Sequence, residues 1–209
     1  MRDICIVGAG GFGREVLWLI QRINEKEKCW NILGYIDDHI PAGTSLDEYP
    51  VLGTCEDLLG MEDVWVVVAV GASKVRRQIV EKIACSGKLH FATLIDPSVL
   101  LSKRVTIGEG SIICAGSILT VDIQVGKHVI INLDCTVGHD AVMGDFTTVY
   151  PSANISGCVT IGEGTELGTG MQIIQGRTIG EECIIGAGTV VIRDIPAGSK
   201  AVGNPARIL

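Results

Sequence analysis

A hexapeptide period dominates the C-terminal half of this 209-residue chain. From residue 101 onward every sixth residue is apolar, and the next residue is often glycine, as at positions 108, 126, 138, 144, 162, 168, 180 and 186. A period of six matches neither the repeat of an α-helix nor the alternation of a strand. It predicts a hexapeptide-repeat parallel β-helix, in which the apolar side chains point inward and glycine serves the tight corners. Three hexads make one coil, so the series gives about five coils. The series consists of Leu101, Ile107, Ile113, Leu119, Val125, Ile131, Val137, Met143, Val149, Ile155, Ile161, Leu167, Ile173, Ile179, Ile185 and Val191.

Residues 1–97 follow a different pattern, in which strand and helix signals alternate. We expect strands over 3–7, 31–36, 64–70 and 91–95, and helices over 14–27 and 73–86, the second capped by Ser73. Alternating strands and helices imply a parallel sheet. The fold class is therefore α/β followed by β. We expect a small Rossmann-like domain over 1–97 and a β-helix with a short C-terminal tail over 98–209.

The composition excludes several classes of protein. Hydrophobic residues make up 47% of the chain and charged residues 20%, which predicts a compact protein rather than a disordered one. The net charge of −7 disfavours nucleic acid as a partner. No stretch has the length of a membrane span, the N-terminus does not resemble a secretory signal, and the eight cysteines form no CxxC pair. We expect a cytoplasmic protein with reduced cysteines and no membrane insertion.

A glycine-rich turn follows the first expected strand. Gly8, Gly10 and Gly13 have the spacing of a dinucleotide fingerprint, and Asp37 and Asp38 end the second strand. Glycines let a backbone approach phosphate, and a helix N-terminus favours an anion. About four strands are too few for two mononucleotide-binding halves, so NAD is disfavoured. The alternative is a tight turn in a docking domain that binds no ligand.

The chain has four histidines, of which only His128 and His139 lie in the hexapeptide region. A zinc carbonic anhydrase of hexapeptide type needs three histidine ligands, so that function is excluded. His139 stands at a corner and is followed by Asp140, as a general base would be followed by the carboxylate that orients it. His128 lacks such a carboxylate and is expected to be a surface residue. On the residues alone, the favoured interpretation of His139 is a surface histidine on a turn.

The chain resembles one family over its whole length. The resemblance rests on the hexads and on five short motifs: GAGGFG at 8–13, YIDD at 35–38, IGAG at 185–188, DIPA at 194–197 and VGNPAR at 202–207. The family comprises the UDP-4-amino-sugar N-acetyltransferases and sialic acid O-acetyltransferases of bacterial glycan assembly. The resemblance implies a left-handed coil, a homotrimer with active sites between adjacent subunits, acetyl-coenzyme A as cosubstrate and no metal.

The resemblance also implies roles for individual residues. His139 would be the general base and Asp140 its partner. The nucleotide end of a nucleotide sugar would lie against Gly10, Gly11, Phe12, Asp37, Asp38 and Gly71. Acetyl-CoA would lie against Thr148, Gly157, Thr169 and Ala187, along one side of successive coils. Phe12 and Thr148 depart from the family, since relatives often have histidine at both positions.

The function expected from these observations is acetylation of an amino or hydroxyl group on a nucleotide-activated sugar, by direct attack. No cysteine or serine next to His139 in the sequence suggests a covalent intermediate. Two alternatives stay open: O-acetylation of sialic acid or another polysaccharide precursor, and a non-catalytic scaffold that binds sugar nucleotides. The sugar, the nucleotide and the choice between N- and O-acetylation also stay open.

Overall fold

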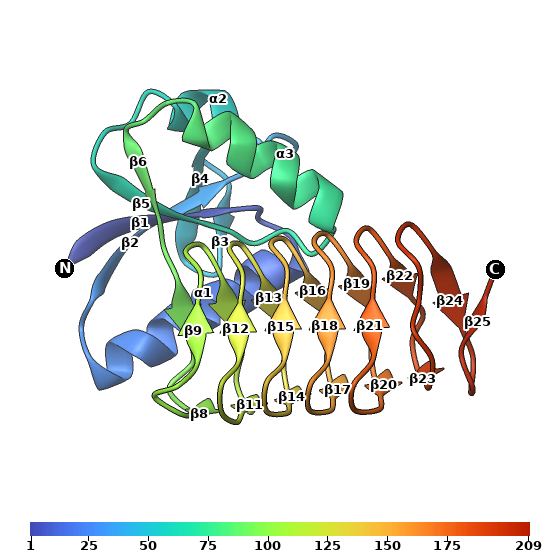
Figure 1. Cartoon of the computed structure of the whole chain (residues 1–209). Coiled ribbons are helices and arrows are strands. Elements are labelled where there is room, and N and C mark those ends of the chain that lie inside the picture. Colours follow the sequence, from blue (N-terminus) through green and yellow to red (C-terminus); the bar gives the residue numbers. More distant parts are fainter. The chain divides into compact units, whose positions relative to one another are not determined.

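The computed structural model describes residues 1–209, which form two compact units, Met1–Pro97 and Ser98–Leu209 (Figure 1). The fold class expected from the sequence is confirmed: a mixed α/β unit precedes a parallel β-helix. No helix has both the length and the apolar character that crossing a bilayer requires.

The N-terminal unit is built around a six-stranded sheet with the order β3-β4-β2-β1-β5-β6. β1 pairs in parallel with both β2 and β5, so the carboxyl ends of these three strands lie at one edge of the sheet. The strands are β1 (Arg2–Val7), β2 (Trp30–Ile36), β3 (Ser45–Leu46), β4 (Tyr49–Gly53), β5 (Val64–Val68) and β6 (Leu89–Phe91), with the short β7 (Leu94–Ile95) following. The helices are α1 (Gly11–Lys26), α2 (Cys55–Leu58) and α3 (Ser73–Ala84).

Burial explains the strands and the long helices of this unit. β5 has the sequence VWVVV and is almost wholly buried, as a continuous apolar run in a parallel sheet should be. α1 buries Val16, Leu17 and Ile20 on one face, which confirms the helical spacing seen in the sequence.

Three expectations for this unit need correction. α1 begins at Gly11 rather than residue 14, and Ser73 is the first residue of α3 while Ala72 is its N-cap. The expected strand over 91–95 is two short strands, β6 and β7. The antiparallel β3–β4 hairpin and α2 were not predicted from the sequence.

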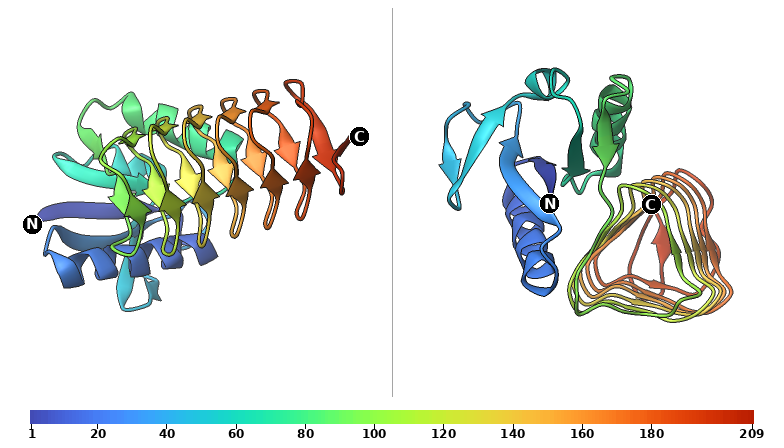
Figure 2. Two further views of the ribbon diagram at one scale, coloured as in Figure 1. Left: turned by 60° about the horizontal axis from the view of Figure 1, so that its bottom comes forward. Right: turned by 90° about the vertical axis from the view of Figure 1, so that its left-hand side faces the viewer.

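The C-terminal unit is a β-helix with a triangular cross-section (Figure 2, right). From β8 to β23 each strand has two residues, the strands join three parallel sheets in turn, and paired residues are 18 positions apart, as in Ile112 and Ile130. Sheet I contains β10 (Ile112–Ile113), β13 (Ile130–Ile131), β16 (Thr148–Val149), β19 (Glu166–Leu167), β22 (Ile184–Ile185) and β24 (Lys200–Val202), with β25 (Arg207–Ile208) antiparallel to β24. Sheet II contains β8 (Leu100–Leu101), β11 (Ile118–Leu119), β14 (Thr136–Val137), β17 (Asn154–Ile155), β20 (Gln172–Ile173) and β23 (Val190–Val191). Sheet III contains β9 (Thr106–Ile107), β12 (Gln124–Val125), β15 (Val142–Met143), β18 (Thr160–Ile161) and β21 (Thr178–Ile179).

The hexad residues form the core of the coil. Each is the second residue of its strand, and from Ile113 to Val191 all are buried. The first coil differs, since Leu101 is 40% exposed and Ile107 is only half-buried. No earlier coil of this unit stacks below them, so the inward position does not bury them fully.

The glycines after the hexad residues act differently from what the sequence suggested. A Cβ at Gly138 would lie 2.5 Å from the amide nitrogen of Gly157 in the next coil, and Gly126, Gly144, Gly162 and Gly168 are crowded in the same way. These glycines let consecutive coils stack closely. The left-handed backbone that turns the corner falls two residues later, for example at Asp140 with φ 59°.

Candidate active site on the β-helix

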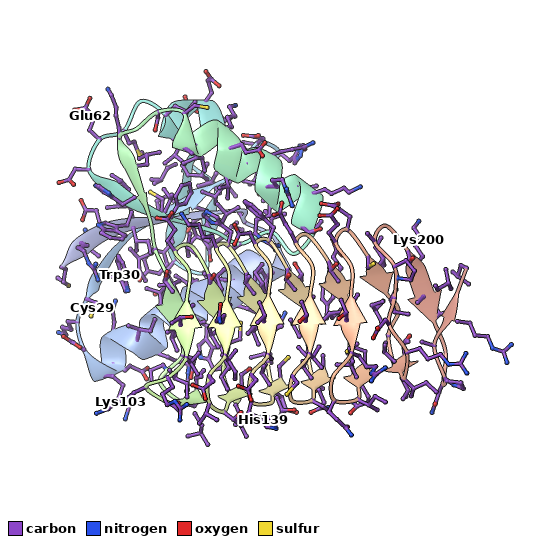
Figure 3. The ribbon with its side chains drawn as sticks, viewed as in Figure 1. Cys29, Trp30, Glu62, Lys103, His139 and Lys200 are labelled. Carbon is purple, nitrogen blue, oxygen red and sulfur yellow. The ribbon has the colours of Figure 1, made fainter.

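His139 and Asp140 form a contact at the corner between sheets II and III. They follow β14 and precede β15, and the imidazole projects from the outer side of the coil (Figure 3). The Nδ1 atom of His139 lies 2.7 Å from a carboxylate oxygen of Asp140. Both side chains are more than half exposed. With the ring proton on Nδ1 and donated to Asp140, the lone pair is on Nε2, where it is able to accept a proton from a substrate.

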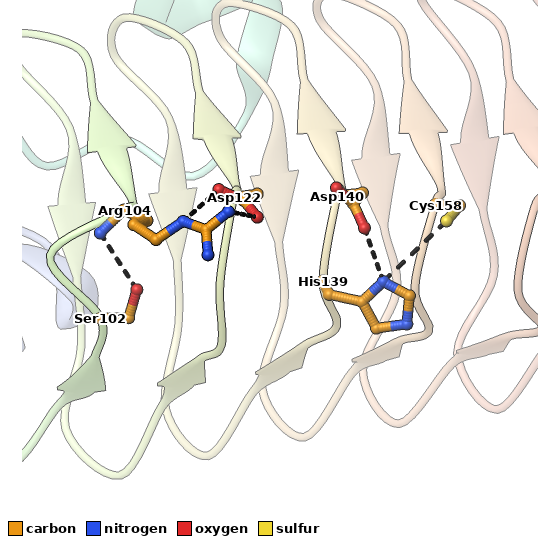
Figure 4. Close-up of polar contacts among 6 residues, drawn as sticks. All are labelled: Ser102, Arg104, Asp122, His139, Asp140 and Cys158. Carbon is orange, nitrogen blue, oxygen red and sulfur yellow. Dashed lines mark hydrogen bonds and ion pairs between the residues drawn. The ribbon is translucent and has the colours of Figure 1, made fainter.

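The next coil supplies the surroundings of the ring. A Cβ placed on Gly157 would lie 2.5 Å from Nε2 of His139, so only glycine at this position leaves room for the imidazole where it stands. The Cys158 sulfur lies 4.0 Å from Nδ1 of His139 (Figure 4). Cys158 occupies the same corner position as Asp140, one coil further along, and both have left-handed backbones.

The same corner carries other charged contacts on the coils to either side. Arg104 pairs with Asp122 on the N-terminal side of His139 (Figure 4), where the side chains of both line a hollow of about 310 Å³ with Thr106. On the C-terminal side, Asp194 accepts a hydrogen bond from the amide of Thr178 at 3.0 Å. Asp194 is therefore engaged in holding the corner.

His128 does not lie on the surface, which corrects the expectation from the sequence. It is 5% exposed, its ring stacks on Phe146 with centroids 5.1 Å apart, and a Cβ at Gly110 would meet the ring at 2.1 Å. His128 is the third residue after its hexad residue, whereas His139 is the second. Gly110 and Phe146 occupy the equivalent positions of the neighbouring coils, and the ring of His128 is packed against both.

The four residues expected to line the acetyl-CoA groove do not lie along one side of the β-helix. Thr169 and Ala187 stack at the corner between sheets I and II, where the amide of Gly188 bonds to the carbonyl of Thr169. Gly157 lies at the corner between sheets II and III, beneath the His139 ring. Thr148 is buried on β16. A single copy of the chain therefore does not unite these four positions.

Candidate nucleotide site on the N-terminal unit

The residues expected to bind a nucleotide gather at one edge of the sheet. Gly10, Gly11 and Phe12 follow β1, Asp37 and Asp38 follow β2, and Gly71 follows β5. Because these parallel strands are neighbours, their carboxyl ends meet at the same edge. A hollow of about 320 Å³ at this edge is lined by ten residues: Val7, Gly8, Ile36, Asp37, Asp38, His39, Cys55, Val70, Val75 and Ile79.

Asp37 holds the glycine-rich turn in place. One of its carboxylate oxygens accepts a hydrogen bond from the amide of Ala9 at 2.9 Å, and the other accepts from the amides of His39 and Ile40. Partial burial favours the neutral acid, but these three N–H groups together hold the pKa of Asp37 below its ordinary value. The Ala9 amide, which sits in the turn where a fingerprint would meet phosphate, is thus directed at Asp37. Asp38 accepts a hydrogen bond from the amide of Cys55 at 2.7 Å.

The glycines of the turn fall into two groups. Gly8 has φ 100°, and a Cβ at Gly13 would lie 2.0 Å from the carbonyl oxygen of Gly8, so the fold itself requires both. A Cβ at Gly10 or Gly11 would meet no atom within 4 Å. Folding therefore does not explain why these two positions lack side chains.

Gly71 lies in a loop held by a buried arginine that the sequence analysis missed. Arg76 is 1% exposed, and its Nη1 donates to the carbonyl of Val70 at 2.7 Å and to that of Gly71 at 2.9 Å. The contact fixes the turn from β5 into α3. The helical spacing of α3 could have marked Arg76 as inward-facing, since it is one turn before the buried Val80.

Relationship to known proteins

The chain combines a β-helical coil, an exposed histidine–aspartate pair and a preceding α/β unit. This combination defines the class of hexapeptide-repeat transferases. Residues 3–83 match the family described as the PglD N-terminal domain. Over 210 aligned residues the chain is 31% identical to GDP-perosamine N-acetyltransferase of Escherichia coli O157:H7, covering 97% of this chain and 94% of that protein. A shorter match, 37% over 118 residues, relates it to UDP-N-acetylbacillosamine N-acetyltransferase of Bacillus subtilis, covering 55% of this chain and 52% of that protein. The chain belongs to the PglD-type hexapeptide-repeat sugar N-acetyltransferases.

Solved structures of related proteins match the fold of this chain over its whole length. A histidine-to-asparagine mutant of perosamine N-acetyltransferase from Caulobacter crescentus, in complex with CoA and GDP-perosamine, has a TM-score of 0.91 at 29% identity. That match covers 100% of this chain and 97% of the other. The acetyltransferase domain of PglB from Neisseria gonorrhoeae, in complex with acetyl coenzyme A, has a TM-score of 0.90 at 32% identity, covering 100% of this chain and 99% of the other. The family resemblance drawn from the sequence is confirmed.

Proposed function

We propose that the protein transfers the acetyl group of acetyl-CoA to the amino group of a nucleotide-linked amino sugar, with His139 as general base. The contact between His139 Nδ1 and Asp140 carries the proposal, because it leaves Nε2 free to accept a proton on the outer side of the coil. The related proteins support this choice of substrates. The names of the related enzymes specify amino sugars linked to GDP or UDP, and the related solved structures contain CoA or acetyl-CoA.

The reaction would proceed by direct attack. The amine nitrogen bonds to the thioester carbonyl carbon while Nε2 of His139 takes a proton from that nitrogen, and the C–S bond breaks to release CoA as thiolate. The Asp140 carboxylate, 2.7 Å from Nδ1, stabilises the imidazolium that forms. The proton then passes from His139 to the CoA thiolate or to water, which returns the base to its starting state.

The proposed acceptor site is the edge of the N-terminal sheet where β1, β2 and β5 end. The open space at Gly10 and Gly11 supports it, since the fold leaves room there for phosphate or sugar to approach the backbone. Asp38 has an exposed carboxylate at the same edge and remains the candidate contact to the nucleoside. Asp37 serves mainly to hold the turn.

We further propose a homotrimer with active sites between adjacent subunits. His139 lies at the corner between sheets II and III, whereas Thr169 and Ala187 lie at the corner between sheets I and II. If all three act on acetyl-CoA, the groove combines one corner of one subunit with a different corner of its neighbour. Analytical ultracentrifugation should give three times the mass of the chain, and a fully active monomer would refute the assembly.

The experiment that tests the activity is consumption of acetyl-CoA, followed by the release of free CoA thiol, against a panel of acceptors. The panel contains GDP-, UDP- and dTDP-linked 4-amino sugars, matched 4-hydroxy sugars and free sialic acid. The proposal requires turnover with at least one amino sugar and none with its hydroxyl counterpart. Turnover restricted to sialic acid would instead establish the O-acetyltransferase alternative. The expected compartment is the cytoplasm, because eight thiols without a disulfide suit a reducing environment.

A further inference from the structure

Cys158 is a third potential ligand beside the proposed catalytic pair. Its sulfur lies 4.0 Å from Nδ1 of His139, which in turn lies 2.7 Å from the Asp140 carboxylate. The three ligand atoms all lie within 4.8 Å of one another, and all three residues are exposed. Proton transfer through Nε2 does not use the thiol, so the proposed reaction leaves this cluster unexplained.

The donor set is that of a soft or borderline divalent cation. Thiolate sulfur, imidazole nitrogen and carboxylate oxygen are the three ligand types of protein zinc sites. Tetrahedral Zn²⁺ with bonds of ~2.0–2.3 Å places its ligand atoms about 3.3–3.7 Å apart. The two separations from Nδ1, 4.0 Å and 2.7 Å, bracket that range, and the third, between Asp140 and Cys158, is at most 4.8 Å. Rotations of these exposed side chains therefore bring the three atoms to bonding positions. A fourth position would remain for water.

We propose that His139 Nδ1, Asp140 and Cys158 form a site for Zn²⁺ or a similar cation, and that the bound cation inhibits the enzyme. A neutral imidazole has one ring proton and one lone pair. A cation on Nδ1 takes the lone pair there, so the ring proton must reside on Nε2, and Cys158 releases its thiol proton to solvent. Nε2 then has no lone pair with which to accept a proton from the amine. The inhibitory half of this inference rests on the proposed function, whereas the cation site does not.

Cobalt spectroscopy tests the site without reference to activity. Co²⁺ bound to a thiolate shows a sulfur-to-cobalt charge-transfer band in the near ultraviolet, so the probe is Co²⁺ alone added to the full-length protein. The matched control is Cys85→Ser, because Cys85 is the other exposed cysteine. We expect the band in the wild type and in Cys85→Ser, and its loss in Cys158→Ser. No band in the wild type, or a band that persists in Cys158→Ser, overturns the site.

Zinc titration of the acetyl-transfer reaction tests the inhibition. Losing one ligand of three should cost at least the ~10-fold in affinity that losing a supporting group costs. The Zn²⁺ concentration for half-inhibition should therefore rise at least about tenfold in Cys158→Ser but not in Cys85→Ser, and EDTA should restore turnover. Turnover that Zn²⁺ does not reduce, in protein that gives the cobalt band, overturns the inhibitory role. A cobalt band in protein that acetylates no amino sugar supports the site while refuting the proposed function.

Discussion

Gly157 lies directly beneath the imidazole of His139, with room for a hydrogen but not for a methyl group. A Cβ at 157 would lie 2.5 Å from Nε2 and 2.7 Å from Cε1 of the ring. The equivalent corner position in other coils holds Val121, Gln175 and Arg193, so the corner itself accepts a side chain. Gly157 is not among the residues with positive φ. The three nearest atoms that a side chain at 157 would meet all belong to the ring of His139.

Gly157→Ala should displace His139 without disturbing the coil. Moving a catalytic group by about 1 Å costs roughly 10²-fold in turnover, and we expect kcat to fall by that amount. The KM for acetyl-CoA should stay near its wild-type value. A double-mutant cycle supplies the control: in a His139→Ala background, Gly157→Ala should have almost no further effect. A raised KM for acetyl-CoA with unchanged kcat would instead assign Gly157 to the donor groove.

The general base itself is tested by His139→Ala, which should reduce turnover by roughly 10²–10⁴-fold while acetyl-CoA still binds. Asp140→Asn should have a smaller effect, and asparagine tolerates the left-handed backbone at φ 59°, so the corner is preserved. Asp134→Asn makes the same change at another corner, also with positive φ, and should leave turnover unchanged. More than about half of wild-type turnover in His139→Ala is incompatible with a proton-transfer role of this size.

The β-helix was predictable because its period encodes the structure directly. One apolar residue in six fixes the inward position, and the residues 18 apart that pair in each sheet follow from three hexads per coil. The same spacing of 18 residues places Gly157 beside His139 and Cys158 beside Asp140, so both neighbours could be predicted from the sequence. The sequence could not reveal how little space separates the coils, which depends on coordinates. The surface position expected for His128 was wrong, since its burial depends on stacking against Phe146 of the next coil.

The α/β unit was predictable where local patterns are strong. β5 and α1 carry continuous or periodic apolar residues. The β3–β4 hairpin was missed because its turn residues, Asp47 and Glu48, have φ 47° and 71° without the Asn-Gly or Asp-Gly sequence that usually marks such turns. For Asp37 the sequence predicts a contact to a nucleotide, which stays a prediction. That the carboxylate accepts hydrogen bonds from the amides of Ala9, His39 and Ile40 depends on coordinates that no local pattern reveals.

The glycine-rich turn gives a prediction with an internal control. A Cβ at Gly11 would meet no atom within 4 Å. Gly11→Val should therefore weaken binding of the acceptor, raising its KM by about tenfold or more, while the melting temperature and the KM for acetyl-CoA stay near wild type. Gly13→Ala should show the opposite behaviour, since its Cβ would collide with the carbonyl of Gly8 at 2.0 Å and destabilise the unit. Steady-state kinetics with both substrates, together with thermal melting, distinguish the effect of Gly11→Val from that of Gly13→Ala. Equal loss of both substrates in folded Gly11→Val would indicate a turn that serves structure alone.

Asp37 gives a prediction about stability and pH. Hydrogen bonds to a charged group contribute about 1.5–3 kcal/mol each, so Asp37→Asn should lower the melting temperature at neutral pH by loosening the turn at Ala9. Because the pKa of Asp37 is lower in the folded protein than in the unfolded chain, its stabilisation is complete above the unfolded value of about 3.9 and is lost as the pH falls through the lower folded value. The difference in melting temperature between wild type and Asp37→Asn should therefore be constant from about pH 7 to pH 5 and shrink below about pH 4.

The control for this titration is Asp47→Asn. Asp47 is an exposed carboxylate of the same unit whose ion pair with Arg14, at 2.9 Å, is about half exposed on both sides. Exposed pairs contribute at most about 1 kcal/mol, so this variant should melt close to the wild type across the whole range. A difference for Asp37→Asn that persists unchanged to about pH 3 would show that the shape of the side chain, rather than its charge, holds the turn. In that case, protonation of the Asp37 carboxylate would not loosen the glycine-rich turn before α1.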